Sequence, residues 1–151
     1  WRYDPRIYRS RPHAEIANRG VTSWVDPDAG PDDPCRHRIF VGTLDARLIA
    51  LDGKTGKPCA DFGEKGEVRL DKDVRADAES EWVNYTVTSP PVIVGDTVVV
   101  GSAIGDNRAV ESELGIVRGI DARNGAERWR WAVTARPACR SASSRIIRGA
   151  P

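Results

Sequence analysis

The chain has 151 residues, with 23 Lys and Arg against 22 Asp and Glu, so its formal net charge is +1. This balance gives no general argument for a nucleic-acid or acidic-lipid partner, and no run approaches the ~18 apolar residues of a membrane span. The length suits one domain with a real core. The chain lacks Met and the apolar segment of a signal peptide, so we expect it to be a fragment.

Strand signals begin near residue 38 and predict a three-stranded meander. Residues 38–42 are rich in β-branched and aromatic side chains, and residues 46–52 form a second such run. The segment 53–56 has turn chemistry, and we expect Lys57 to Phe62 to return as the third strand.

Two hairpins are predicted in the second half of the chain. Residues 91–94 and 98–100 flank a Gly-Asp turn, and residues 116–121 and 127–131 flank the Asn124-Gly125 turn. No segment is a convincing helix, because the one candidate, residues 74–82, is rich in acidic residues and has no apolar stripe. The sequence therefore predicts an all-β protein.

An internal repeat links the two halves. Residues 50–57 resemble residues 119–126. Each copy contains an Asp and, four residues later, a Gly, and the two Asp residues, Asp52 and Asp121, lie 69 residues apart. The Asp side chain can bond to turn backbone, the Gly can supply a positive φ, and a following Trp, such as Trp129, can pack between sheets. Such repeats are typical of propeller blades of roughly 40–45 residues, and a ring needs roughly 4–8 of them. The chain is therefore either a propeller fragment or an open sheet domain with a similar pattern.

The sequence resembles the pyrroloquinoline-quinone (PQQ) dependent dehydrogenases, most closely their membrane-associated glucose and quinate branch. The resemblance covers roughly residues 1–131 and follows the family order in four stretches: residues 18–21, 38–63, 86–91 and 101–121. It implies a partial β-propeller, with about two four-stranded antiparallel blades of an eight-bladed ring. On this interpretation residues 1–131 are the propeller part, and residues 132–151 form a separate basic tail.

The resemblance also implies a reaction. The full-length enzyme would bind PQQ and calcium, oxidise a sugar, polyol or cyclic hydroxy acid, and pass electrons to ubiquinone or a cytochrome. It would work in the periplasm, with or without an inner-membrane anchor. The family's catalytic Asp and main calcium ligands belong to later blades, so we assign no catalytic residue or metal ligand here and expect the isolated chain to be inactive. The alternative function is a non-catalytic propeller module that serves as a binding or assembly scaffold.

Three residues match cofactor-contacting positions of the family. Arg19 lies in the Asn-Arg-Gly motif, and its guanidinium suits a carboxylate or quinone oxygen. Thr88 matches a threonine whose hydroxyl faces PQQ, and Ser102 begins a loop that contacts the cofactor. The structural alternatives are a surface ion pair for Arg19 and a backbone hydrogen bond for the Thr88 hydroxyl.

The sequence departs from the family at several positions. His13 and Ala14 replace the vicinal disulfide of the alcohol-oxidising branch, and Glu15 stands where glucose-type members have a His. Asp106 and Asn107 follow the strand after which the alcohol branch has a calcium-binding Glu, but a solvated turn explains them better than a position facing the cofactor. The acidic run of Asp77, Glu79 and Glu81 suits solvated surface better than a cation site.

The cysteines and the tail give two further expectations. Cys35 precedes the first strand of the predicted meander and Cys59 lies on the third, which separates them by ~9.6 Å, beyond the ~7 Å limit for a disulfide. We therefore expect free thiols, unless the chain folds back at Cys35. Residues 132–151 contain four Arg, no acidic residue and no hydrophobic period. We expect them to be loosely placed, as the product of a frameshift or truncation rather than a functional basic arm.

Overall fold

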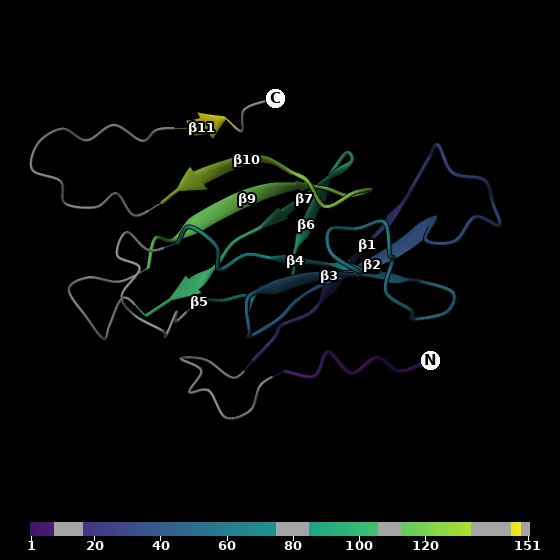
Figure 1. The fold of residues 1–151 in the computed structure, drawn as a ribbon, viewed down its shortest axis with the longest axis horizontal. Helices are drawn as coiled ribbons and strands as arrows, with labels where there is room; N and C mark the ends of the chain where they lie inside the picture. The colour runs from purple at the N-terminus through teal and green to yellow at the C-terminus, as the bar shows by residue number, and fades with distance from the viewer. Residues whose placement is uncertain (8–16, 75–84, 106–112, 134–145, 149–151) are drawn as a thin grey trace, which may run out of the picture.

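A computed structural model describes residues 1–7, 17–74, 85–105, 113–133 and 146–148. Every regular element in these ranges is a strand, as predicted, and none is a helix that could cross a membrane (Figure 1). The strands are β1 (Val21–Val25), β2 (His37–Gly42), β3 (Arg47–Asp52), β4 (Glu67–Arg69), β5 (Tyr85–Thr86), β6 (Val92–Val94), β7 (Thr97–Val100), β8 (Ala103–Ile104), β9 (Ile116–Asp121), β10 (Glu127–Ala132) and β11 (Ile146–Arg148).

The first sheet has four antiparallel strands in the order β1-β2-β3-β4. The predicted strand from Lys57 to Phe62 does not form. The start of this segment lies beside the end of β3, through the Pro58–Leu51 bridge and hydrogen bonds that join Lys57 to Asp52 and Cys59 to Ala50, but it does not continue as a strand. Phe62 instead turns into the core, where its ring packs 5.4 Å from that of Phe40. The first half of β3, residues 47–49, is paired with β4, which lies farther along the chain.

The second sheet has five strands in the order β11-β10-β9-β7-β6, and β5 pairs separately with β8. Both predicted hairpins, β6–β7 and β9–β10, are confirmed. The sheet has one strand more than expected, because β11 pairs antiparallel with β10. Four residues of the expected tail thus belong to this sheet, Ala132 at the end of β10 and the three of β11, whereas residues 134–145 and 149–151 lie outside the described residues.

The two repeated turns are built as the sequence predicts. Asp52 Oδ1 accepts hydrogen bonds from the backbone N–H of Lys54 and of Thr55, and Asp121 Oδ1 accepts those of the two corresponding residues in the second copy. Gly56 and Gly125 close these turns with φ values of 72° and 77°. Burial raises the pKa of Asp52, but the hydrogen bonds it accepts outweigh burial and lower that pKa below its ordinary value.

Tryptophan rings cover glycines in both halves. A Cβ on Gly119 would lie 2.2 Å from Trp129 Cε2, and one on Gly56 would lie 2.4 Å from Trp1 Cδ2. Trp1 Nε1 also donates to the carbonyl of Gly53 at 3.1 Å. These contacts require glycine, because any side chain would overlap the indole.

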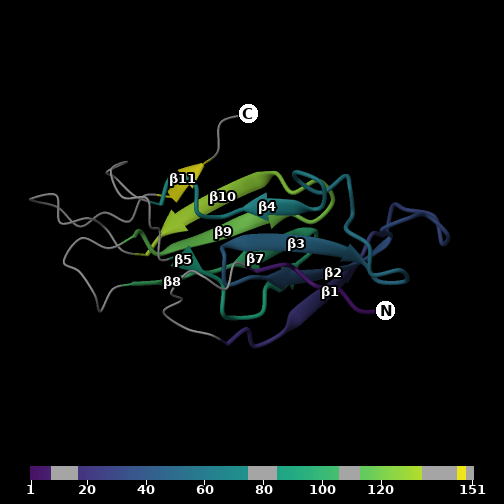
Figure 2. The same cartoon turned by 60° about the horizontal axis from the view of Figure 1, so that its bottom comes forward.

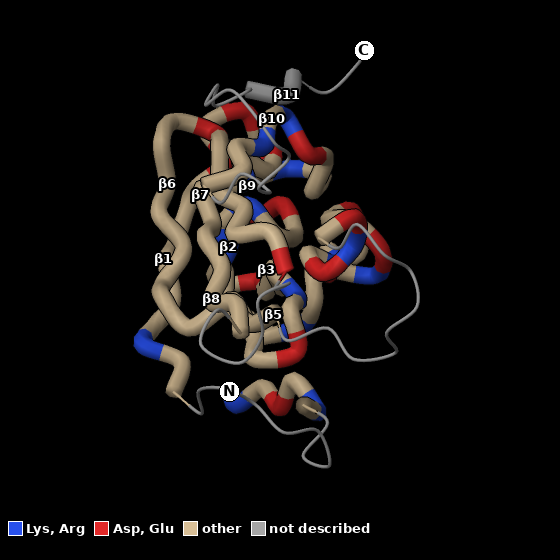
Figure 3. Tube along the Cα trace, turned by 90° about the vertical axis from the view of Figure 1, so that its left-hand side faces the viewer, with Lys and Arg blue, Asp and Glu red and all other residues tan. Residues whose placement is uncertain are grey.

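The two sheets pack against each other around one core (Figure 2). β1 and β6 lie side by side at one edge (Figure 3). Arg38, only 3% exposed, links the sheets by donating to the carbonyl of Arg123 at 2.6 Å. A second link runs from the N–H of Gly63 to the carbonyl of Asn124 at 2.8 Å. Both sheets therefore share a polar seam as well as apolar contacts.

The expectation of free thiols at Cys35 and Cys59 is wrong. The two residues form a disulfide with a Cα–Cα distance of 5.8 Å. Cys35 has a φ of 59° and donates its N–H to Asp52 Oδ2, so the chain folds back over the end of β3. Cys59 donates its N–H to the carbonyl of Ala50 and therefore lies beside β3 rather than one strand farther away.

Candidate functional site

The Asn-Arg-Gly motif stands immediately before β1 and is held at both ends. The Asn18 side-chain amide donates to the carbonyl of Gly42, and its Oδ1 accepts the N–H of Gly20 at 2.9 Å. Gly20 has a φ of 150°, and a Cβ there would lie 3.2 Å from Pro90 Cγ. The motif is thus fixed between the end of β2 and the segment that leads into β6.

Arg19 and Thr88 are neighbours in space. The N–H of Arg19 donates to the carbonyl of Thr88 at 2.9 Å. The Arg19 side chain is exposed, whereas Thr88 is only 7% exposed. The fold therefore joins the backbone of an exposed arginine to that of a buried threonine, close to the edge where β1 and β6 lie together.

A second hydroxyl lies two residues before Thr88. Val87 packs against Gly42, where an added Cβ would lie 2.2 Å from Val87 Cγ1. An extended chain then directs Thr86 and Thr88 to the opposite side. Thr86 Oγ1 is buried and, among the described residues, has no hydrogen-bond partner. A polar ligand at this position would satisfy a hydroxyl that is otherwise costly to bury.

The Ser102 hydroxyl is already engaged by protein. It donates to the carbonyl of Ile116 at 3.3 Å and accepts the N–H of the same residue at 3.2 Å. Tyr85 Oη donates to the same carbonyl at 3.3 Å, and burial raises the pKa of Tyr85. Ser102 thus connects β7 and β9, and its side chain is not brought into contact with Arg19 or Thr88 by any described interaction.

Most other sequence candidates cannot be placed. His13, Ala14 and Glu15, the acidic run at 77–81, and Asp106 and Asn107 lie outside the described residues. The one described group of three potential metal ligands is Cys35, Cys59 and Asp61. Two of these are the bonded cysteines, whose sulfurs are not thiolates, so the group does not form a metal centre.

Three arginines that sequence reasoning did not single out organise the space between the sheets. Arg38 and Arg118 are each 3% exposed, and Arg123 lies 5.3 Å above the Trp24 ring. Arg123 also donates to Asp26 and Asp96. The signal was available for two of them: Arg38 shares an inward strand face with Phe40, and Arg118 lies between the inward Ile116 and Ile120.

The donor groups of Arg19, Thr86 and Thr88 suit an acidic, oxygen-rich ligand. Arg19 offers a cationic fork, which matches a carboxylate, and Thr86 and Thr88 offer hydroxyls. These residues fit the carboxylates and quinone oxygens of PQQ. The described residues at this edge do not form a metal-ligand cluster.

Comparison with known proteins places the chain in a family. Residues 1–146 match the model of the PQQ glucose/ethanol/alcohol dehydrogenase beta-propeller domain. The chain is 36% identical over 134 residues to the glycerol dehydrogenase large subunit of Gluconobacter oxydans (strain 621H), with 88% of this chain and 18% of the relative covered. It is 40% identical over 95 residues to the quinate/shikimate dehydrogenase (quinone) of Acinetobacter baylyi (strain ATCC 33305 / BD413 / ADP1), with 63% and 12% covered.

The fold comparison agrees. The crystal structure of quinohemoprotein alcohol dehydrogenase from Comamonas testosteroni superimposes with a TM-score of 0.63 at 28% identity, covering 87% of this chain and 16% of that chain. The chain thus spans less than a fifth of the length of these relatives. Its two sheets correspond to part of a propeller and not to a closed ring. The chain belongs to the family of PQQ-dependent dehydrogenase β-propellers.

Proposed function

We propose that this chain is part of a periplasmic PQQ-dependent dehydrogenase that oxidises a sugar, a polyol or a cyclic hydroxy acid. The observation that carries the proposal is the pairing of Arg19 with Thr88 beside the edge shared by β1 and β6. The substrate range is supported by the family description and by relatives named for glycerol and for quinate or shikimate.

Each residue at this edge has a definite task in the proposal. PQQ, when bound, supplies the quinone that accepts hydride from the substrate. The Arg19 guanidinium binds a cofactor carboxylate. The hydrogen bond from the backbone N–H of Arg19 to the carbonyl of Thr88 fixes the backbone from which this side chain extends. The Thr88 hydroxyl, and the unpartnered hydroxyl of Thr86, donate to cofactor oxygens. Ser102, whose hydroxyl bonds to Ile116, supports the loop after β7 rather than the cofactor directly.

The remaining features extend the proposal to the whole protein. Calcium as the resident metal, and ubiquinone or a cytochrome as the electron acceptor, follow from the resemblance. The disulfide between Cys35 and Cys59 supports an oxidising compartment such as the periplasm.

The test is PQQ binding by the complete gene product with substitutions in this segment. We expect Arg19→Gln to weaken PQQ binding by about tenfold or more, because a charge-assisted hydrogen bond is lost. Arg36→Gln is the matched control, since Arg36 lies in the β1–β2 loop and donates to the carbonyl of Ala29. Equal PQQ affinity in the two variants would contradict the assignment of Arg19. A gene that encodes no further blades would instead favour the scaffold function.

A further inference from the structure

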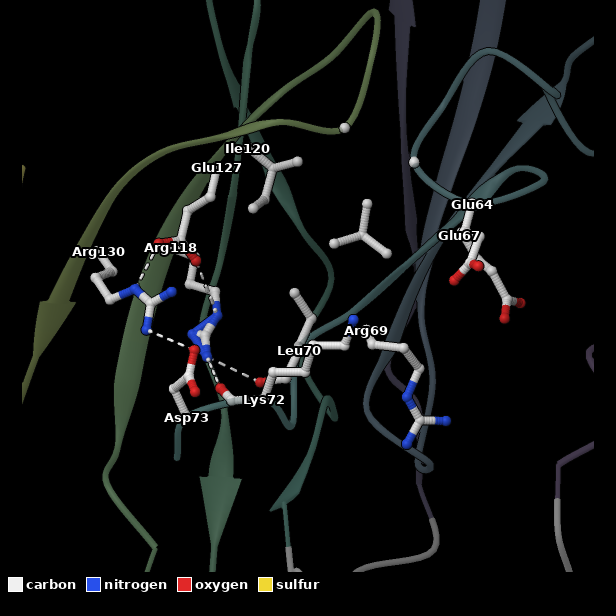
Figure 4. A pocket seen from close by; sticks show the side chains of 13 residues that line it. Glu64, Glu67, Arg69, Leu70, Lys72, Asp73, Arg118, Ile120, Glu127 and Arg130 are labelled. Carbon is white, nitrogen blue, oxygen red and sulfur yellow. Dashed lines mark hydrogen bonds and ion pairs between the residues drawn. The ribbon is translucent and has the colours of Figure 1, made fainter. Parts of the chain in front are cut away.

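A pocket of about 300 Å³ lies between the two sheets, and neither Arg19 nor Thr86 nor Thr88 lines it (Figure 4). One wall comes from β4 and the residues that follow it, and the other comes from β9 and β10. Val68, Leu70 and Ile120 supply apolar surface, and Ile120 is fully buried. The pocket therefore combines a small apolar surface with two charged walls, which carry acidic residues (Glu64, Glu67, Asp73 and Glu127) as well as basic ones.

Arg118 reaches into this pocket from β9 with an incompletely satisfied guanidinium. Its Nη2 donates to the carbonyls of Leu70 and Lys72 at 2.9 and 3.2 Å. Its Nη1 is buried and has no partner among the described residues, although the residue is only 3% exposed. A buried guanidinium donor without an acceptor is costly, and an incoming acceptor would remove that cost.

The carboxylate that pairs with Arg118 is shared with Arg130. Glu127 Oε2 lies 3.5 Å from Arg118 Nε, while Glu127 Oε1 already accepts a 2.5 Å hydrogen bond from Arg130 Nε. Burial lowers the pKa of Arg118, which agrees with weak compensation of its charge. On the opposite wall of the pocket, Arg69 of β4 forms an ion pair with Asp71.

We propose that this pocket binds a small monocarboxylate with an apolar body. The carboxylate would accept from Arg118 Nη1, which a side-chain movement must first open to the pocket, and the body would rest on Val68. The site is separate from the Arg19–Thr88 edge, and binding does not depend on PQQ. A pocket of this volume takes a ligand the size of benzoate.

The experiment titrates the 151-residue chain with benzoate and follows the backbone amide chemical shifts of Leu70, Ile120 and Gly125. Benzamide, a neutral molecule of the same shape, is titrated in parallel at equal ionic strength. We expect saturable shifts with benzoate and an affinity at least about tenfold lower for benzamide, because only the carboxylate pairs with the guanidinium.

Variants then assign the donor. Arg118→Met should abolish the benzoate response, whereas Arg69→Met should retain it, because the Arg69 guanidinium is already engaged by Asp71. Equal binding of benzoate and benzamide, a benzoate response that survives in Arg118→Met, or no saturable shift at all would overturn the proposal. If Arg118→Met does not fold, the comparison of benzoate with benzamide on the unmodified chain decides the question.

Discussion

Removing the disulfide should measurably destabilise this chain. Cys35 and Cys59 are separated by 24 residues, so the bond closes a loop in the unfolded state as well as in the fold. The chain-entropy relation gives about 3.5 kcal/mol at 25 °C for a loop of that size. Since small domains are stable by only about 5–15 kcal/mol, this is a large fraction of the total.

The cleanest variant is Cys35→Ser, because Cys35 is partly exposed and Cys59, which is fully buried, then keeps its own side chain. Urea unfolding of the oxidised chain and of Cys35→Ser should differ in midpoint by more than about 1 M, given m-values of about 1–3 kcal/mol/M. Cys139→Ser is the matched control, because it removes a cysteine without touching this bond.

Thiol counting tests the same bond chemically. Denatured, unreduced protein should contain one reactive thiol, whereas reduction should reveal all three cysteines. Three reactive thiols before reduction, or equal urea midpoints for Cys35→Ser and Cys139→Ser, would refute the reasoning.

Two further predictions concern packing and charge. Gly119→Ala should destabilise the chain by roughly 1–3 kcal/mol in urea unfolding, because its Cβ would overlap Trp129, whereas Gly101→Ala, with open space around it, should change stability little; similar losses in both would contradict the contact. Hydrogen bonds from Arg128 hold the pKa of Asp96 well below its usual range, so the pair stabilises the fold above the ordinary value near 3.8 and loses this effect as the pH falls below it. The stability difference between the unmodified chain and Asp96→Asn should therefore shrink from pH 6 toward pH 2 in unfolding measurements, and a difference that does not depend on pH would argue against the ion pair.

Local chemistry made the hairpins and turns predictable from sequence. Asn124-Gly125 supplied the residues that its turn conformation needs, and the spacing from Asp52 to Gly56 was sufficient to predict side-chain-to-backbone bonds. These features depend on residues within one turn, where propensity and hydrogen bonding act without long-range contacts.

The errors arose where distant residues compete for one position. Phe62 gains more by packing on Phe40 than by extending a strand, which leaves the edge of β3 to β4. The disulfide prediction failed because it assumed a flat meander, whereas the positive φ of Cys35 turns the chain over β3. Neither outcome has a local sequence signal.

The candidate site was predicted in part. The resemblance pointed to Arg19 and Thr88, and the fold brings their backbones together. The unpartnered hydroxyl of Thr86 and the buried Arg118 were missed, because their significance depends on which neighbours leave them unsatisfied. For Arg118, a charge at an inward strand position was the available clue.

The most direct test of the account is reconstitution of the complete gene product that contains this chain. The protein would be prepared without cofactor, supplied with calcium, and assayed for dye-linked oxidation of glucose, glycerol and quinate as PQQ is added. We predict no turnover without PQQ and saturable turnover of at least one substrate with it, while the 151-residue chain alone remains inactive. Turnover by the complete protein that does not depend on PQQ, or its absence with every substrate of the three classes despite bound PQQ, would contradict the proposed function.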